Sequence, residues 1–297
     1  MVDDNELLTG IDIGTTKICA MIGKVNKNEE IEILSLGLAP SYGLKKGVVV
    51  DIDKTIFSIK EAVRNAEQML GIPIKSAFVG LAGAHILSLN NRAKIEIKRR
   101  NNIIISSDKD RVIKKASELN IPSTHQMIHA IPRGFIVDGQ DGISEPIGFA
   151  GRSLEVDLHV ITGAVTSIQN IITSVNRAGI LVEDIVLEPI ASSESVLSVE
   201  EKEAGVILID IGGGTTDLAI FVDGRIWHTF VLPVGGNHVT QDIGVGLRIL
   251  FLQAEDIKKE YGSAFVDGID SFDFLEIKEV GRGLRTILKR RLAEIIE

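Results

Sequence analysis

The stretch that decides the fold is VILIDIGGGTTDLAIF, residues Val206–Phe221, and it has a near copy in LTGIDIGTTK, residues Leu8–Lys17. In each copy an apolar strand ends on an acid, glycines and threonines follow, and a second alternating strand begins. This order is typical of a β-hairpin with a polar bend. Because both first strands end on an acid, Asp12 and Asp210, we predict two related domains that hold the phosphates of a nucleotide from both sides of a cleft.

Both bends carry the residue types that bind phosphate and its metal. Glycines let the main chain pass close to a ligand in conformations that other residues avoid, and its N–H groups can then point at phosphate oxygens. Threonine hydroxyls add donors, while the acids suit Mg²⁺ held through its waters. The predicted first loop is Asp12, Gly14, Thr15 and Thr16, and the second is Asp210, Gly212, Gly213, Gly214, Thr215 and Thr216, with Asp12 and Asp210 as metal ligands. For either bend alone, an ordinary glycine turn is the competing interpretation.

Glu188 is the candidate catalytic residue. It begins a predicted helix in LEPIASSESVL, next to the expected phosphate site. From such a position a glutamate can orient a water for attack on the terminal phosphoryl group. The competing interpretation, at even odds, is an acid that the N-terminal helix dipole favours.

Two further segments supply candidate nucleotide contacts. Gly235, Gly236 and Asn237 directly follow a strand, which again indicates a close approach of the backbone to a ligand. In a later helix, Glu255 and Lys258 lie three residues apart on one face and are candidates for a ribose and an adenine edge. An ordinary surface ion pair is slightly favoured for them on spacing alone.

Composition excludes several classes of protein. A net charge of −9 argues against nucleic-acid binding, which needs clustered Lys and Arg. Two basic triplets, at 98–100 and 289–291, are candidates for contact with a partner or with lipid. We expect both to be solvated surface instead. A single cysteine, an acidic N-terminus and the absence of a long apolar run predict a cytoplasmic protein. Neither GxxxxGK[ST] nor GxGxxG occurs, which removes the P-loop and weakens a dinucleotide fold.

The pattern along the chain predicts an α/β protein with an insertion. A helix is expected from Asp53, as N-cap, to Gly71. Residues 85–165 change character, with short strands at 94–98 and 103–107, a charged helix at 108–119 and further strands, and they are predicted to form a small α+β subdomain. The last stretch, 284–297, is helical in pattern and has no C-terminal cap, so we expect a longer protein that has been cut here.

Taken together, the paired motifs, EPIASS, VGGNHVT and AEDIKKEYG resemble the superfamily of actin, heat-shock chaperone and sugar-kinase ATPases. GLKKGVVVDI, HAIPRGFIVDG and the terminal LAEIIE narrow the resemblance to the FtsA family of actin-like bacterial cell-division proteins, over effectively the whole chain. The resemblance implies a two-lobed actin-like ATPase fold, related to ribonuclease H, with an inserted subdomain and an incomplete second lobe. The implied subdomains are 1A (1–84 and 166–192), 1C (85–165), 2A (193–240, partial) and 2B (241–297, partial).

What the resemblance implies in function is a protein that binds ATP and Mg²⁺, with at most weak ATPase activity. It would polymerise through subdomain 1C and tie filaments of the tubulin-like FtsZ to the inner face of the plasma membrane at the division septum. Family members continue for about a hundred residues more, with a glycine-rich adenosine loop and an amphipathic membrane helix that this sequence lacks. We therefore expect weak or no ATP binding by this chain alone. The alternatives are a pilus-assembly protein of the PilM type and a sugar or acetate kinase of the same fold.

Overall fold

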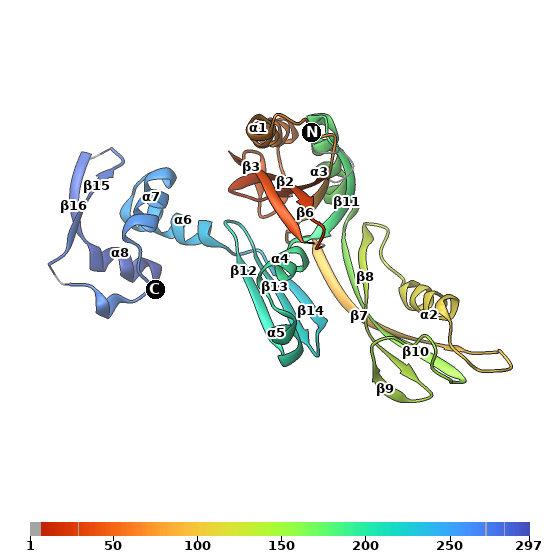
Figure 1. Cartoon of the computed structure of the whole chain (residues 1–297). Helices are drawn as coiled ribbons and strands as arrows, with labels where there is room; N and C mark the ends of the chain where they lie inside the picture. The colour runs from red at the N-terminus through yellow and green to blue at the C-terminus, as the bar shows by residue number, and fades with distance from the viewer. Residues whose placement is uncertain (1–6, 29, 271, 282) are drawn as a thin grey trace. The chain divides into compact units, whose positions relative to one another are not determined.

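The computed structural model of the chain describes residues 7–28, 30–270, 272–281 and 283–297 (Figure 1). Contacts divide it into two units. The first comprises the described residues up to Asp210 together with Thr215–Pro233, and the second comprises Ile211–Gly214 together with Val234–Glu297. The N-terminal acids that argue against a secretory leader fall largely outside the described residues.

A five-stranded mixed sheet forms the core of the first unit. Its order is β11-β6-β1-β2-β3, and the strands span Leu181–Leu187, Ser76–Leu81, Leu7–Ile13, Lys17–Val25 and Ile31–Pro40. β1, β2 and β3 are antiparallel neighbours, whereas β6 lies parallel to both β1 and β11. In the register of β1 and β2, Asp12 lies opposite Cys19 and Ile13 opposite Ile18. The predicted first hairpin is therefore confirmed, with its bend at residues 14–16.

Two helices pack on this sheet through one apolar core. α1 (Ile52–Leu70) and α3 (Val165–Ala178) share that core with the sheet and lie against each other. Gly71 ends α1 in a left-handed conformation with φ of 73°, as its predicted role requires. The predicted N-cap at Asp53 is wrong by two residues. Asp51 has the extended backbone that a cap needs, and its side chain accepts a hydrogen bond from the Lys54 N–H, so Asp53 lies in the first turn.

The inserted segment folds as a separate sheet with its own core. Its order is β7-β10-β8-β9, with strands at Ile86–Glu96, Ser153–Ala164, His125–Val137 and Gln140–Ile143, and α2 (Ser106–Ser117) packs on it. The strand predicted at 103–107 is wrong. Ile103 makes only an isolated bridge to Ala150, and the Asp108 carboxylate accepts from the Ile105 N–H, which starts the helix instead.

A three-stranded sheet, β12-β13-β14, contains the second predicted hairpin, which is confirmed. Its strands span Val206–Ile211, Thr216–Val222 and Arg225–Leu232, and α4 (Glu188–Val196) and α5 (Val199–Ala204) precede it. Its small core contains Ala219, Phe221 and Ile226, with Ile190 of α4 packed against them. Across to the insertion, the Ser88 hydroxyl of β7 donates to the Thr229 carbonyl of β14 at 2.6 Å.

The second unit is built from helices and one hairpin. α6 (Gly236–Leu247), α7 (Phe251–Tyr261), a 3₁₀ turn at Val266–Gly268, β15 (Phe274–Glu279), β16 (Gly283–Leu288) and α8 (Lys289–Ile296) follow in order. The helix predicted over 284–297 is wrong in its first part. Thr286 and Ile287 are β-branched residues that favour a strand, and β16 pairs along its length with β15, so the helix begins only at Lys289. Among the described residues, no helix has both the length and the apolar character needed to span a membrane.

Candidate nucleotide and metal site

A cavity of about 330 Å³ lies over the middle of the five-stranded sheet in the first unit. Alternation along the strands places Asp12 and Cys19 on the face opposite to the core residues Ile13 and Ile18. The N-terminal half of α4 and Asp210, at the end of β12, complete the lining. The structure therefore brings together both predicted metal ligands and the predicted catalytic residue, Glu188, around one cavity.

Glu188 reaches this cavity because of its place at the start of α4 and because of a glycine beneath it. It is the first residue of the helix, where the helix dipole favours an acid, and Pro189 follows in the position that needs no N–H partner. On β6, a Cβ added at Gly80 would lie 3.3 Å from Cγ of Glu188. Gly80 thus leaves the room in which the glutamate side chain lies against the sheet.

The carboxyl groups of this site repel one another. Burial raises the pKa of Glu188 well above its ordinary value, and the neighbouring Asp12, Asp217 and Asp210 raise it further. Burial also raises the pKa of Asp12, which the hydrogen bond from Glu188 and the charge of Lys17 offset only in part. The Oε1 atom of Glu188 is inaccessible to solvent and has no hydrogen-bond partner among the described residues. The cluster therefore favours uptake of a proton or of a cation from outside.

Asp217 belongs to the same cluster and was missed by the sequence reasoning. It is 3% exposed, its Oδ1 atom has no partner within the described chain, and burial, with a contribution from Asp210, raises its pKa to about 6. A signal was present in the sequence. Asp217 shares its strand face with the core residues Ala219 and Phe221, so alternation alone places a charge at an inward position.

The first bend needs its glycine for space rather than for an unusual conformation. Gly14 does not have a positive φ, but a Cβ there would lie 2.9 Å from the Lys17 carbonyl oxygen. The expected role of conformational freedom is therefore wrong at this position. Thr15 accepts a hydrogen bond from the Gly47 N–H at 3.2 Å, while Thr16 is exposed. The Thr15 hydroxyl thus keeps its proton available for an external acceptor.

In the second unit, the glycines of the second bend lie against the segment that starts α6. The N–H groups of Gly236 and Asn237 donate to the carbonyls of Gly212 and Gly213 at 2.9 and 2.8 Å. A Cβ at Gly235 would lie 2.5 Å from the Gly212 oxygen, so only glycine permits this approach. Two of the predicted N–H donors are thus already used within the protein. Of the two bend threonines that belong to the first unit, Thr215 is buried and hydrogen-bonds to Asp217, and Thr216 begins β13.

Glu255 and Lys258 form the expected ion pair at 2.7 Å, but as part of a larger network. Lys258 also donates to the Gly236 carbonyl at 3.0 Å and to the buried Thr240 hydroxyl at 2.8 Å. Burial alone would raise the pKa of Glu255, yet hydrogen bonds from Lys258, Thr240 and Lys259 outweigh it and lower that pKa. Each side chain is 21% exposed, so this is a half-buried pair rather than a solvated one.

The donor set of the first unit fits Mg²⁺. No group of three or more His, Cys, Asp or Glu side chains is arranged to hold a metal ion directly in the described part of the chain. Mg²⁺, however, keeps several waters and usually takes only one or two carboxylates plus phosphate oxygens. Asp12 and Asp210, next to a buried carboxylate oxygen with no partner, match that requirement in charge and in donor type.

Comparison with known proteins supports the same assignment of fold. PilM in the PilM–PilN type IV pilus biogenesis complex superposes with a TM-score of 0.65 at 16% identity, covering 86% of this chain and 70% of the other. MreB5 of Spiroplasma citri bound to ADP gives 0.50 at 18% identity, covering 99% and 75%. The chain therefore has the mixed α/β actin-like fold that was predicted.

Sequence models identify the family. The SHS2 domain inserted in FtsA matches residues 83–162, and the model of cell division protein FtsA matches residues 207–293. The FtsA proteins of Pseudomonas aeruginosa and Bacillus subtilis are 43% and 38% identical over 297 residues, which is all of this chain and 71% and 67% of their own length. The chain belongs to the FtsA family of cell division proteins.

Proposed function

We propose that this chain acts in bacterial cell division as an actin-like protein that binds ATP together with Mg²⁺. The cell-division part follows from membership of the FtsA family. The nucleotide part is supported by the uncompensated carboxylate cluster, and by related folds, since MreB5 of Spiroplasma citri has been solved bound to ADP and to AMPPNP.

The single observation that carries the proposal is the group formed by Asp12, Glu188, Asp210 and Asp217. A buried group of like charges is costly unless a cation neutralises it. Two of its oxygens lack any hydrogen-bond partner among the described residues, and the cavity beside it has room for a ligand. A magnesium ion would supply the missing positive charge and polarise the phosphate oxygens beside it.

The residue roles we propose keep, with one exception, to what the sequence predicted. Asp12 and Asp210 hold the metal, and Glu188 orients water at the terminal phosphate. The phosphate contacts are Gly14, Thr15, Thr16, Gly212, Gly213, Gly214, Thr215 and Thr216. Gly235, Gly236 and Asn237, predicted as further contacts, support the second bend instead, because their N–H groups donate to His238, Gly212 and Gly213. Glu255 and Lys258 are the contacts to the nucleoside.

The partners we propose are FtsZ and further copies of the chain. In this proposal the nucleotide state controls self-association through the inserted subdomain. The polymer ties FtsZ filaments to the cytoplasmic face of the cell membrane at the septum. A C-terminal helix of the whole protein supplies the membrane contact. Pilus assembly and sugar or acetate phosphorylation, the two alternatives, are disfavoured because the chain belongs to the FtsA family.

Calorimetric titration of ATP with and without Mg²⁺ tests the nucleotide part. We expect heat of binding that requires Mg²⁺, measured up to millimolar nucleotide. Equal heats in Mg²⁺ and in chelator would contradict the proposed metal site.

Sedimentation with FtsZ filaments tests the partner. We expect this chain to pellet with FtsZ assembled in GTP and to stay in the supernatant with FtsZ kept unassembled in GDP. No enrichment in the pellet would remove FtsZ as a partner of this chain.

A further inference from the structure

β7 is the outer strand of the inserted sheet, and the two halves of its outer edge differ. The first half contacts β14 through side chains, because Ser88 and Asn90 hydrogen-bond to the carbonyls of Thr229 and Trp227. In the second half, Arg92–Glu96, side chains of α2 donate to main-chain carbonyls of β7. An outer edge of this kind is a template for another strand unless it is covered.

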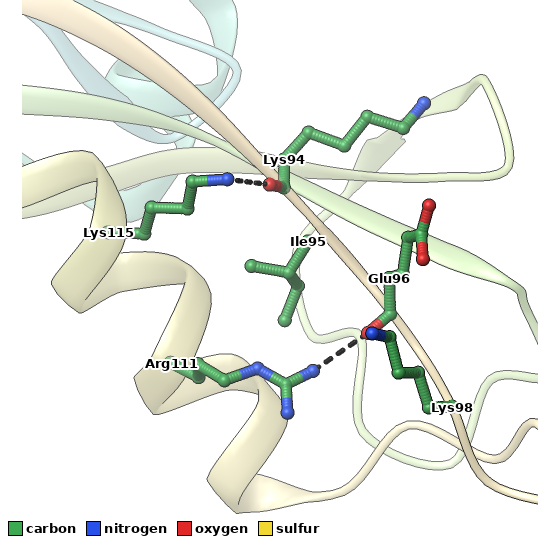
Figure 2. Close-up of a pocket in the computed structure, with 6 residues that line it drawn as sticks. All are labelled: Lys94, Ile95, Glu96, Lys98, Arg111 and Lys115. Atoms are coloured by element: carbon green, nitrogen blue, oxygen red, sulfur yellow. Dashed lines mark hydrogen bonds between the residues drawn. The ribbon is translucent and has the colours of Figure 1, made fainter.

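Two cations of α2 occupy the carbonyls of this edge. Lys115 Nζ donates to the Lys94 carbonyl at 2.8 Å and Arg111 donates to the Glu96 carbonyl at 2.9 Å (Figure 2). Both side chains are exposed; Lys115 ends on a neutral oxygen, whereas Arg111 also pairs with Asp108 at 3.2 Å. The ends of these two exposed side chains therefore cover the outer carbonyls of Lys94 and Glu96, and an incoming strand can displace them.

A cavity of about 560 Å³ opens at this place, and its lining is strongly basic. The lining contains four cations, Lys94, Lys98, Arg111 and Lys115, one acid, Glu96, and Ile95. In Figure 2 the side chains of Lys94 and Glu96 extend away from α2, whereas that of Ile95 extends toward it. The positive charge of this lining is opposite in sign to the net charge of the chain, which is −9.

The positive charge of the cavity is only partly neutralised by the protein. Lys94 is paired with Glu155 at 3.0 Å. Arg111 shares the carboxylate of Asp108 with Arg99, which leaves two guanidinium groups on one acid. Lys98 has neither an ion pair nor a hydrogen bond to the described residues, and Lys115 has only the carbonyl. Three cations therefore remain for an external anion.

We propose that the outer edge of β7, over Arg92–Glu96, takes up an extended acidic peptide of a partner protein as an additional strand. Main-chain hydrogen bonds to the edge would provide affinity, and acids at every second position would provide specificity, as in other cases of strand addition.

The spacing of the cations selects an extended partner. Arg111 and Lys115 are four residues apart on a helix, or about 6 Å along its axis. Alternate side chains of a strand lie about 6.7 Å apart and point to the same face. Acids at positions i and i+2 of the added strand thus match this pair on the side of the sheet that α2 covers. A lipid surface or a nucleic acid offers no main-chain partners for the strand edge.

Fluorescence polarisation with the whole chain tests the proposal. The probe is a labelled octapeptide of alternating glutamate and valine, and the matched control is the peptide EEVVEEVV, of the same composition without the alternation. We expect the alternating peptide to bind at least about fivefold more tightly, since only it presents all its acids on one face. Methylation of its edge-facing amide nitrogens should abolish binding while leaving its charge intact.

Variants of the protein locate the site. Lys115→Glu should weaken binding of the alternating peptide about tenfold, because a favourable contact becomes a repulsion. Lys115→Gln should weaken it about threefold, by loss of one exposed pair. Lys60→Glu, an exposed lysine on α1, is the matched control and should change nothing. Equal affinity for the two peptides, insensitivity to amide methylation, or binding to phosphatidylglycerol vesicles or single-stranded DNA in place of the peptide would each overturn the proposal.

Discussion

Glu188 in the first unit and Glu255 in the second are the same residue in opposite surroundings. Glu188 lies among three aspartates, and its pKa is raised; Glu255 lies among Lys258, Lys259 and Thr240, and its pKa is lowered. Burial acts in the same direction on both, so the neighbours make the difference.

This difference shows which of the two acids is neutralised by cations of its own unit. The network around Glu255 contains its own cation and holds Gly236 and Thr240 in place without any ligand. Around Glu188, the charge of Lys17 offsets the burial and repulsion of the acids only in part. We infer that the first is a preorganised frame, whereas the second is arranged to receive positive charge from outside.

Removing a proposed metal ligand should have the largest effect, on the affinity for ATP with Mg²⁺. Asp210→Ala should weaken Mg²⁺-dependent ATP binding by about 10- to 100-fold, the usual loss when a group that positions a metal through hydrogen bonds is deleted. The fold should persist, because the change lies at the end of a strand. Isothermal titration calorimetry measures the affinity, with the exposed Asp141→Ala as control. An unchanged affinity in Asp210→Ala would remove this residue from the metal site.

Removing the internal cation of the second unit should destabilise it. Lys258→Met removes the donor to Glu255, Thr240 and the Gly236 carbonyl. The free energy of unfolding should fall by about 2 kcal/mol. Hydrogen exchange followed by mass spectrometry should show faster exchange in α6 and α7. Lys259→Met is the matched control, since that lysine is 69% exposed and its pair is worth about 0.5 kcal/mol or less. Equal effects of the two substitutions would erase the contrast between the sites.

The opposite sign is expected for the first unit without ligand. Glu188→Gln keeps the shape of the side chain but removes the repulsion from its neighbours, so the free energy of unfolding should rise by about 1.5 kcal/mol. Chemical unfolding followed by the fluorescence of Trp227 measures it. Glu194→Gln on the same helix alters only a pair whose glutamate is 72% exposed, and should be neutral or slightly destabilising. Destabilisation by Glu188→Gln would mean that the cluster is already compensated.

His159 is a buried group whose neutral form the folded protein favours. Burial, and then the charges of His228 and Arg133, lower the pKa of His159 to about 4, and its ring nitrogens bond to Asn90 and Thr229. Below pH 6.5 the unfolded chain takes up a proton that the folded His159 refuses, so stability falls as the pH falls. From pH 6.5 to 5.5 this loss is about 1 kcal/mol. In His159→Asn, unfolding curves at the two pH values should differ by that much less; an identical difference would contradict the assignment.

Local patterns carried most of the fold, and the errors lie in where individual elements begin and end. The hairpins after Asp12 and Asp210 were predictable because the apolar strand, the bend and the alternation lie within one short stretch. Residues 284–288 were assigned to a helix although Gly281 and Gly283 signal a turn before them, and they pair with β15 in a hairpin.

The site shows the same division. Glu188 was accessible to sequence reasoning as an acid at a helix start, whereas Asp217 depended on which face of β13 is buried. Gly80 matters only because α4 is packed above it, a contact between residues more than a hundred positions apart. The use of the Gly236 and Asn237 N–H groups by Gly212 and Gly213 was likewise invisible in the sequence.

The position of a bound metal decides whether Asp12, Asp210 and Glu188 form a metal site. Crystals grown with ATP and Mn²⁺ in place of Mg²⁺ would reveal the ion in an anomalous difference map. We predict one strong peak beside the carboxylates of Asp12 and Asp210, in the cavity that Glu188 lines. A fully occupied metal and nucleotide elsewhere, with this cluster left without a cation, would contradict the account.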